Sequence, residues 1–233
     1  RKSVETVAQA YACEAGLEID VEKANAMAAQ ASKDACIVAA SLLKSSRQMR
    51  HKGEAEACAR RAAKLLEEVP SPPRLQADAE TALGELLATS GRFAEATVRY
   101  TTALALREAC ARDLGSDEAR LSVATALTNL ATTLHAVGDD KAVHLLRRSC
   151  AIKFEVLGPD DPRVAKALLR LATAVASDGP VAVFSKKRSP KSKRPMAVAE
   201  ARKLRERAVA ILTQRLGADH ADTRKARAKL AST

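Results

Sequence analysis

The sequence has few aromatic residues: no tryptophan, two tyrosines and three phenylalanines among 233 residues, which is 2% of the chain. Apolar residues still make up 47% of it, so alanine and leucine must supply most of a buried core. A β-sandwich needs aromatic and β-branched side chains on its sheet faces, whereas alanine lets helices pack closely. The composition therefore favours an all-α protein and disfavours a β-sandwich.

Long apolar runs, metal-ligand spacings and catalytic motifs are missing as well. No run of about 18 uninterrupted apolar residues occurs, so we expect no membrane insertion. The five cysteines form no CxxC pair, and their odd number is typical of a reduced intracellular protein. The four histidines form no HExxH motif, and neither GxSxG nor a phosphate-binding glycine-rich loop is found. We therefore expect no enzyme activity, metal, cofactor or small-molecule substrate.

What the chain does have is a repeated Leu-Gly-x-Asp stretch. It occurs at Leu114–Asp117, Leu157–Asp160 and Leu216–Asp219. Glycine can end a helix in left-handed backbone, and a following Asp or Pro is suited to capping or starting the next helix. Three such stretches in one short chain indicate a helical repeat whose units are separated by these turns.

The segment 77–108 shows the repeat unit most clearly. Gly84 and Ala96 are small residues placed where two helices can cross, Gly91 is suited to the turn, and Phe93 and Tyr100 can fill the remaining gaps. The spacing resembles that of the tetratricopeptide repeat (TPR), a pair of antiparallel helices. The residues that carry this resemblance are Leu83, Gly84, Leu87, Gly91, Phe93, Ala96, Tyr100 and Ala103.

Two further copies follow, and they resemble the kinesin-light-chain class of TPR, whose longer unit ends R-E-x-x-L-G-P-D-H-P. The second copy has Leu130, Ala131, Leu134, Gly138, Ala142, Leu146 and Ser149 in register, and the third has Leu171, Ala172, Val175, Gly179, Ala201 and Ala208. The resemblance implies an all-α TPR solenoid, a right-handed superhelix of antiparallel helix pairs. We expect diverged TPR-like repeats over 1–76, three repeats over 77–220, and a partial or capping helix over 221–233.

The resemblance also implies a concave groove lined by the first helix of each repeat. The groove residues in register are Thr81, Glu85, Thr125, Thr128, Asn129, Thr132, His135, Lys166, Arg170 and Thr173. In peptide-binding TPRs an asparagine at the place of Asn129 can hydrogen-bond the main chain of the ligand. Alternatively, Asn129 simply belongs to the Asn-Leu-Ala pattern of the kinesin-light-chain class.

Three of these residues match positions at which chaperone-type TPRs clamp a C-terminal carboxylate: Asn129, Lys166 and Arg170. The other two clamp positions hold lysine and asparagine in those proteins, and here they are Thr81 and Glu85. Because Glu85 would repel a carboxylate, the resemblance favours acidic peptides in general over the clamp itself.

A basic insert interrupts the third repeat. Gly179 and Ala201 are 22 residues apart where the first copy has 5 between Gly91 and Ala96, so 17 residues are inserted at about 180–196. The insert contains no acid and carries six of the net charge of +11, at Lys186, Lys187, Arg188, Lys191, Lys193 and Arg194. Three interpretations stay open: a solvated surface loop, an electrostatic contact to RNA, DNA or an acidic partner, and a regulatory or nuclear-targeting segment in which Ser189-Pro190 is phosphorylated.

These observations predict a non-catalytic scaffold or adaptor that holds a peptide, helix or loop of a partner protein in a multi-subunit assembly. The alternative is a structural subunit of a ribonucleoprotein, for example an organellar ribosome, that contacts RNA through the basic insert and the C-terminal helix. An intracellular location is expected. The cytoplasm fits best, while a mitochondrion, a plastid or the nucleus stays open.

Overall fold

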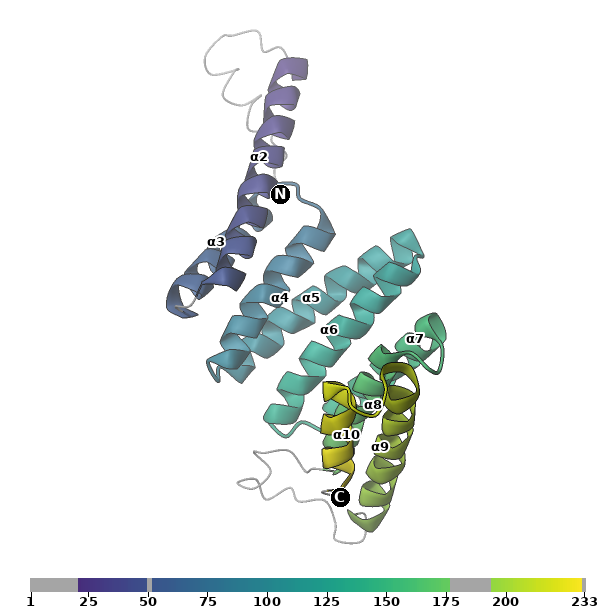
Figure 1. The fold of residues 1–233 in the computed structure, drawn as a ribbon. Helices are drawn as coiled ribbons and strands as arrows, with labels where there is room; N and C mark the ends of the chain where they lie inside the picture. The colour runs from purple at the N-terminus through teal and green to yellow at the C-terminus, as the bar shows by residue number, and fades with distance from the viewer. Residues whose placement is uncertain (1–20, 50–51, 177–193, 232–233) are drawn as a thin grey trace. The chain divides into compact units, whose positions relative to one another are not determined.

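The computed structural model describes residues 21–49, 52–176 and 194–231 (Figure 1). This part of the chain contains nine helices and no strand, so the predicted all-α fold is confirmed. None of the described helices is long and apolar enough to cross a membrane. The helices are α2 (Val21–Gln48), α3 (Lys52–Glu68), α4 (Pro73–Thr89), α5 (Phe93–Leu114), α6 (Asp117–Ala136), α7 (Lys141–Leu157), α8 (Pro162–Ala176), α9 (Arg194–Leu216) and α10 (Ala221–Ala231).

The chain divides into two compact units, residues 1–83 and 84–233. In the first unit, α2, α3 and the first part of α4 share a small apolar cluster. Leu43 of α2, Leu66 of α3 and Ala79 of α4 are members of it. Alanine and leucine form this cluster without any aromatic side chain, as the composition predicts.

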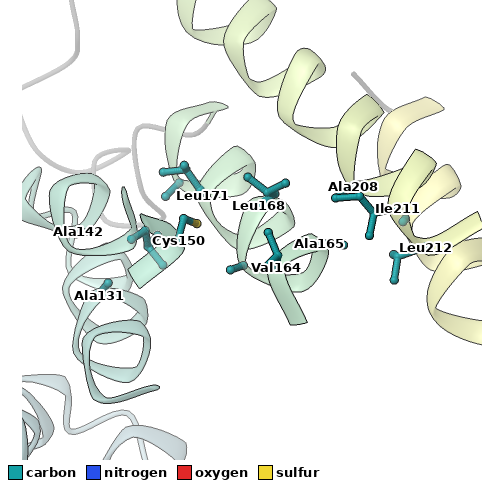
Figure 2. Close-up of a cluster of buried hydrophobic side chains, with 14 residues drawn as sticks. Ala131, Ala142, Cys150, Val164, Ala165, Leu168, Leu171, Ala208, Ile211 and Leu212 are labelled. Atoms are coloured by element: carbon teal, nitrogen blue, oxygen red, sulfur yellow. The ribbon is translucent and has the colours of Figure 1, made fainter. Parts of the chain in front are cut away.

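In the second unit, each helix from α5 to α10 packs against the next one in the chain (Figure 1). A continuous apolar cluster runs from Ala131 of α6 to Ala226 of α10. Figure 2 shows the α8 side chains Val164 and Leu168 between Cys150 on one side and Leu212 of α9 on the other. The many alanines in this cluster allow the helices to approach closely, and leucines fill the space between them.

The Leu-Gly-x-Asp stretches form the turns between helices. Gly115 has a left-handed backbone with φ of 58°, and its N–H donates to the carbonyl of Ala111 at the end of α5. The next residue, Ser116, caps α6, because its hydroxyl accepts from the N–H of Ala119 at 3.2 Å. At the next stretch, the Asp161 carboxylate accepts from the N–H of Arg163 at 2.7 Å and caps α8. The interpretation of these stretches as inter-repeat turns is thus confirmed.

The predicted small positions of the second helices are buried. Ala96 and Ala103 of α5 and Ala201 and Ala208 of α9 are all 0% exposed, as is Ser149 of α7. A larger side chain at any of them would have to displace a neighbouring helix, because cores are packed without spare volume. At these positions of α5, α7 and α9, the small residues that the sequence predicts for helix packing are therefore buried.

Most of the basic insert lies outside the described residues. Of the predicted polyanion-binding or regulatory residues, Lys186, Lys187, Arg188, Ser189, Lys191 and Lys193 lie outside them, and Arg194 is the first residue of α9. The helices on either side of the insert, α8 and α9, pack directly on each other through residues such as Leu168 and Leu212. The three interpretations of the insert remain predictions.

Candidate functional site

A pocket of about 300 Å³ lies among α6, α7 and α8 in the second unit. Helices α6 and α8 are the predicted first helices of two successive repeats, which the sequence assigns to the concave groove. The pocket is lined by Leu121, Thr125, Thr128 and Asn129 of α6, Lys153 and Leu157 of α7, and Arg163, Lys166, Ala167 and Arg170 of α8.

Five of the predicted groove residues meet in this pocket: Thr125, Thr128, Asn129, Lys166 and Arg170. Their positions follow from helix geometry. Residues three or four apart share a face of a helix, so Thr125 and Asn129 are neighbours on α6, as are Lys166 and Arg170 on α8. The packing of α6 and α8 around the end of α7 then brings the two pairs to one place.

The remaining predicted residues lie elsewhere. Thr132 and Thr173 do not line the pocket, and each hydroxyl donates to a carbonyl one turn earlier in its own helix, at 2.8 and 2.9 Å respectively.

His135 is half-buried near the end of α6, and burial lowers its pKa. Glu85 is exposed on α4. Burial of the Tyr100 phenol, together with the charge of Glu85, raises the pKa of Tyr100 to about 12. Thr81 belongs to the first unit and donates to the carbonyl of Ala77.

Thr128 lines the pocket, but its hydroxyl is used within the protein. The side chain is 5% exposed, and its Oγ1 donates to the carbonyl of Ala124 at 2.8 Å. The same oxygen lies 2.8 Å from Oγ of Ser149 on α7, which donates to the Ala124 carbonyl at 2.6 Å. This network fastens α6 to α7, so Thr128 shapes the pocket without offering a hydrogen bond to a ligand.

Asn129 differs from Thr128 in that its side-chain amide forms no hydrogen bond with any described residue. The residue is half-buried on α6, one turn beyond Thr125. An amide offers two donors and an acceptor, which match the N–H and C=O groups of an extended backbone. The structure therefore leaves this amide available to a ligand in the pocket.

The pocket is strongly basic, since four of its lining residues are cations and none is an acid. Two of the cations are already paired. Arg163 forms two hydrogen bonds with Asp161, at 3.1 and 3.0 Å, which hold the pKa of that carboxyl below its usual value. Nζ of Lys166 lies 2.8 Å from Oδ2 of Asp222 on α10, and this contact likewise lowers the pKa of Asp222.

The other two cations, Lys153 and Arg170, have no salt bridge or hydrogen bond to any residue that the structure describes. Arg170 is exposed at the pocket edge, whereas Lys153 is half-buried. Burial lowers the pKa of Lys153, the Cys150 thiolate opposes this shift, and the charges of Arg170 and Arg163 lower the pKa further. Lys153 is thus a partly desolvated cation whose charge is disfavoured by two other cations.

Lys153 was not among the residues predicted from the sequence. It lies on α7, the second helix of its repeat, and the TPR pattern assigns only first helices to the groove. One signal could have found it: Lys153 precedes the Leu157–Gly158 turn by one helical turn, so it faces the start of the next repeat. Within the described ranges, no group of three His, Cys, Asp or Glu side chains could hold a metal ion.

A family model described as "Tetratricopeptide repeat" matches residues 123–163, which cover most of α6, all of α7 and the start of α8. Residues 123–163 are thus similar to a tetratricopeptide repeat. The matched segment contains Asn129, Lys153 and Arg163, so the TPR unit itself builds much of the pocket. No curated protein shows significant sequence similarity to the chain.

Solved structures extend the likeness to most of the chain. Two crystal structures of kinesin-light-chain TPR-like repeats from Podosopora anserina superpose with TM-scores of 0.64 and 0.62, at 19% identity. They cover 82% of this chain and 82% and 83% of their own. BtubC (BKLC) from P. vanneervenii gives a TM-score of 0.62 at 19% identity and covers 92% of this chain and 83% of its own. The fold is a TPR solenoid of the kinesin-light-chain-like type, which confirms the resemblance inferred from the sequence.

Proposed function

We propose that this TPR protein is a non-catalytic scaffold or adaptor that holds a segment of a partner protein against α6 and α8. The TPR fold is a scaffold for protein–protein interaction. The observation that supports this site is the pocket in which the free amide of Asn129 lies with Thr125 and Arg170. An amide that pairs with peptide backbone binds a segment regardless of its side chains, which suits an adaptor.

The lining of the pocket suits binding of a peptide segment better than turnover of a substrate. None of the ten lining residues is an acid, a histidine, a cysteine or a serine. The lining instead offers an amide, threonines and cations, which can pair with the backbone and side-chain groups of a peptide. Thr125 is exposed and short, so it leaves space for an extended chain to lie along α6.

The proposal is tested by comparing which proteins co-purify with the wild-type chain and with an Asn129→Ala variant. We expect specific partners to be lost from the variant while its melting temperature stays unchanged, because the amide has no hydrogen-bond partner in the described structure to lose. Gln214→Ala is the matched control, since it removes an exposed amide from α9. Equal recovery of all partners by Asn129→Ala and wild type would contradict the proposal.

A ribonucleoprotein subunit is the second candidate function, and the surface of α10 favours it. Arg224, Lys225, Arg227 and Lys229 are all exposed on this helix, and Asp222 is its one acid. Such a cluster can contact phosphates without sequence preference, and the affinity then falls steeply as salt rises. Binding of a fluorescent single-stranded RNA is measured over a salt series with wild type and with Arg224→Glu. Absence of RNA binding at low salt would rule this candidate out.

A further inference from the structure

Helix α2 exposes large apolar side chains on the face opposite its buried one. Ala39 and Leu43 are buried and belong to the apolar cluster of the first unit. Ile37 is 67% exposed and Val38 is 47% exposed, so the described residues leave both side chains largely uncovered. Single exposed apolar residues are common, but two adjacent ones on one helix are a candidate contact surface.

Ile37 belongs to a stripe of exposed residues that runs along α2. Residues three or four apart share a face of a helix, which places the members of this α2 stripe above one another. They are Gln30, Asp34, Ile37, Ser41, Lys44 and Gln48, and all six are exposed.

The α2 stripe is symmetric about position 39. Residues equally far before and after that position are Gln30 and Gln48, Asp34 and Lys44, and Ile37 and Ser41. The acid of the stripe thus has the base as its counterpart, and one amide has the other. Such self-complementarity is what a two-fold contact between identical surfaces requires.

The two charges of the stripe are not neutralised within the chain. Nε2 of Gln30 donates to Oδ1 of Asp34 at 3.0 Å, which orients the carboxylate without an ion pair. Lys44 has no salt bridge or hydrogen bond to any residue that the structure describes. Lys33 and Arg47 are exposed further round the helix, where their long side chains can stay in water.

We propose that α2 pairs antiparallel with α2 of a second copy of this chain, about a two-fold axis at position 39. In such a contact each copy contributes the same surface. Asp34 of one copy then faces Lys44 of the other, and this ion pair forms twice. Ile37 and Val38 of both copies lie within one helical turn of the axis, so apolar side chains gather at the centre and charged ones flank them.

The dimer should be weak and reversible. From Gln30 to Gln48 the helix extends about 27 Å, at a rise of about 1.5 Å per residue. One helix pair of this length falls below the standard interface area of about 1,600 Å², so we expect a dissociation constant of about 10–100 µM. The contact uses no residue of the α6–α7–α8 pocket, and it goes beyond the proposed function by joining two such pockets in one assembly.

Sedimentation velocity of the full chain, over concentrations that span this dissociation constant, measures the association. The sedimentation coefficient should rise from that of a monomer towards that of a dimer. Ile37→Asp should weaken the association by more than about tenfold, because it places two carboxylates at the centre of the contact. Val98→Asp is the matched control, since Val98 is 62% exposed on α5 and lies outside the stripe.

Charge exchange tests the antiparallel alignment. Asp34→Lys and Lys44→Asp should each weaken the dimer about tenfold, because both ion pairs become like-charge pairs. An equimolar mixture of the two variants should associate at least as tightly as wild type, because every pair across the axis is again of opposite charge. In a parallel alignment position 34 would face position 34, and each single variant would associate like wild type.

Three results would overturn the proposal. The first is a chain that stays monomeric at every concentration. The second is a pair of single charge variants that associate as tightly as wild type. The third is a monomeric chain whose melting temperature falls with Ile37→Asp but not with Val98→Asp, because the α2 face would then be covered within the same chain, for example by residues 1–20.

Discussion

A Cβ built on Gly84 of α4 would lie 2.9 Å from Cε1 of Tyr100 on α5. The ring of Tyr100 is 4% exposed, and it occupies the space that the missing side chain leaves. This pair is the physical reason for the Leu-Gly and Tyr positions of the repeat, because a small residue on one helix makes room for a large one on the next.

Replacing Gly84 with alanine should destabilise the protein. The added methyl group would force the buried ring to move, and overpacking of this kind costs about 1–3 kcal/mol, partly offset by about 1 kcal/mol of gained helix propensity. Gly53→Ala in α3 is the control, since a Cβ there meets nothing within 4 Å. Chemical denaturation measures both variants. If Gly84→Ala were as stable as Gly53→Ala, the two helices would not cross at this glycine.

The same reasoning applies to Ala103, which is 0% exposed on α5. Ala103→Leu should cost on the order of 1–3 kcal/mol of unfolding free energy, because the larger side chain has no space to enter. Ala105→Leu, two residues along the same helix at an exposed position, should be close to neutral. An unchanged melting temperature for Ala103→Leu would mean that the register assigned to α5 is wrong.

The buried hydroxyl pair of Thr128 and Ser149 should stabilise the contact between α6 and α7. Thr128→Val leaves Ser149 with the Ala124 carbonyl as its remaining partner, and Ser149→Ala leaves Thr128 bonded to that same carbonyl. We expect each single variant to lose about 0.5–1.5 kcal/mol, and the double variant to lose less than the sum. Strictly additive losses in denaturation experiments would show that the two hydroxyls do not interact.

The repeat register was predictable because it depends on local spacing. Gly84, Ala96 and Tyr100 lie within two helices that are adjacent in the chain, and small residues at fixed intervals are visible without a structure. Asn129 and Arg170 were predictable for the same reason, because helical periodicity places them on first-helix faces. Their convergence in one pocket required only that successive repeats stack.

Contacts between distant segments were not predictable in this way. No spacing rule connects Lys166 of α8 with Asp222 of α10, so the sequence did not show that this lysine is already paired. Lys153 was missed because the repeat pattern assigns only first helices to the groove, and Lys153 lies on the second helix α7. Thr128 lies on the face that the periodicity predicts and lines the pocket, but the close approach of α7 diverts its hydroxyl to Ser149.

Cys150 should react slowly with thiol reagents. Burial raises its pKa to about 11, an effect that the nearby Lys153 charge only partly opposes. Compared with the ordinary value of 9.0, about a hundredfold less thiolate is present at neutral pH. Single-cysteine variants that retain only Cys150 or only the half-buried Cys110 provide the comparison. Equal rates for the two in the folded protein would contradict the burial of Cys150.

The same shift predicts how Cys150 contributes to the pH dependence of stability. Below pH 9 the thiol is protonated in both the folded and the unfolded chain, so it has no effect. Between pH 9 and about 11 the unfolded chain releases this proton while the folded chain retains it, and the free energy of unfolding therefore falls. Cys150→Ala should reduce that fall, which denaturation at pH 8 and pH 10 would measure.

Replacing residues 180–192 with a short glycine–serine linker should leave stability nearly unchanged. The flanking helices α8 and α9 pack on each other through their own apolar residues, including Leu168 and Leu212, so the pair does not depend on the insert for its core. Each doubling of loop length changes the closure free energy by only about 0.6 kcal/mol. Thermal denaturation of the shortened chain tests this directly.

Affinity for a polyanion should respond differently to the same replacement. It removes Lys186, Lys187, Arg188 and Lys191, so binding of heparin or RNA should weaken at low salt and converge with that of wild type at high salt, where surface charges are screened. A salt series with both chains measures this. If stability fell sharply while polyanion binding was unaffected, the insert would be part of the packed core, and its charge would have no role in binding.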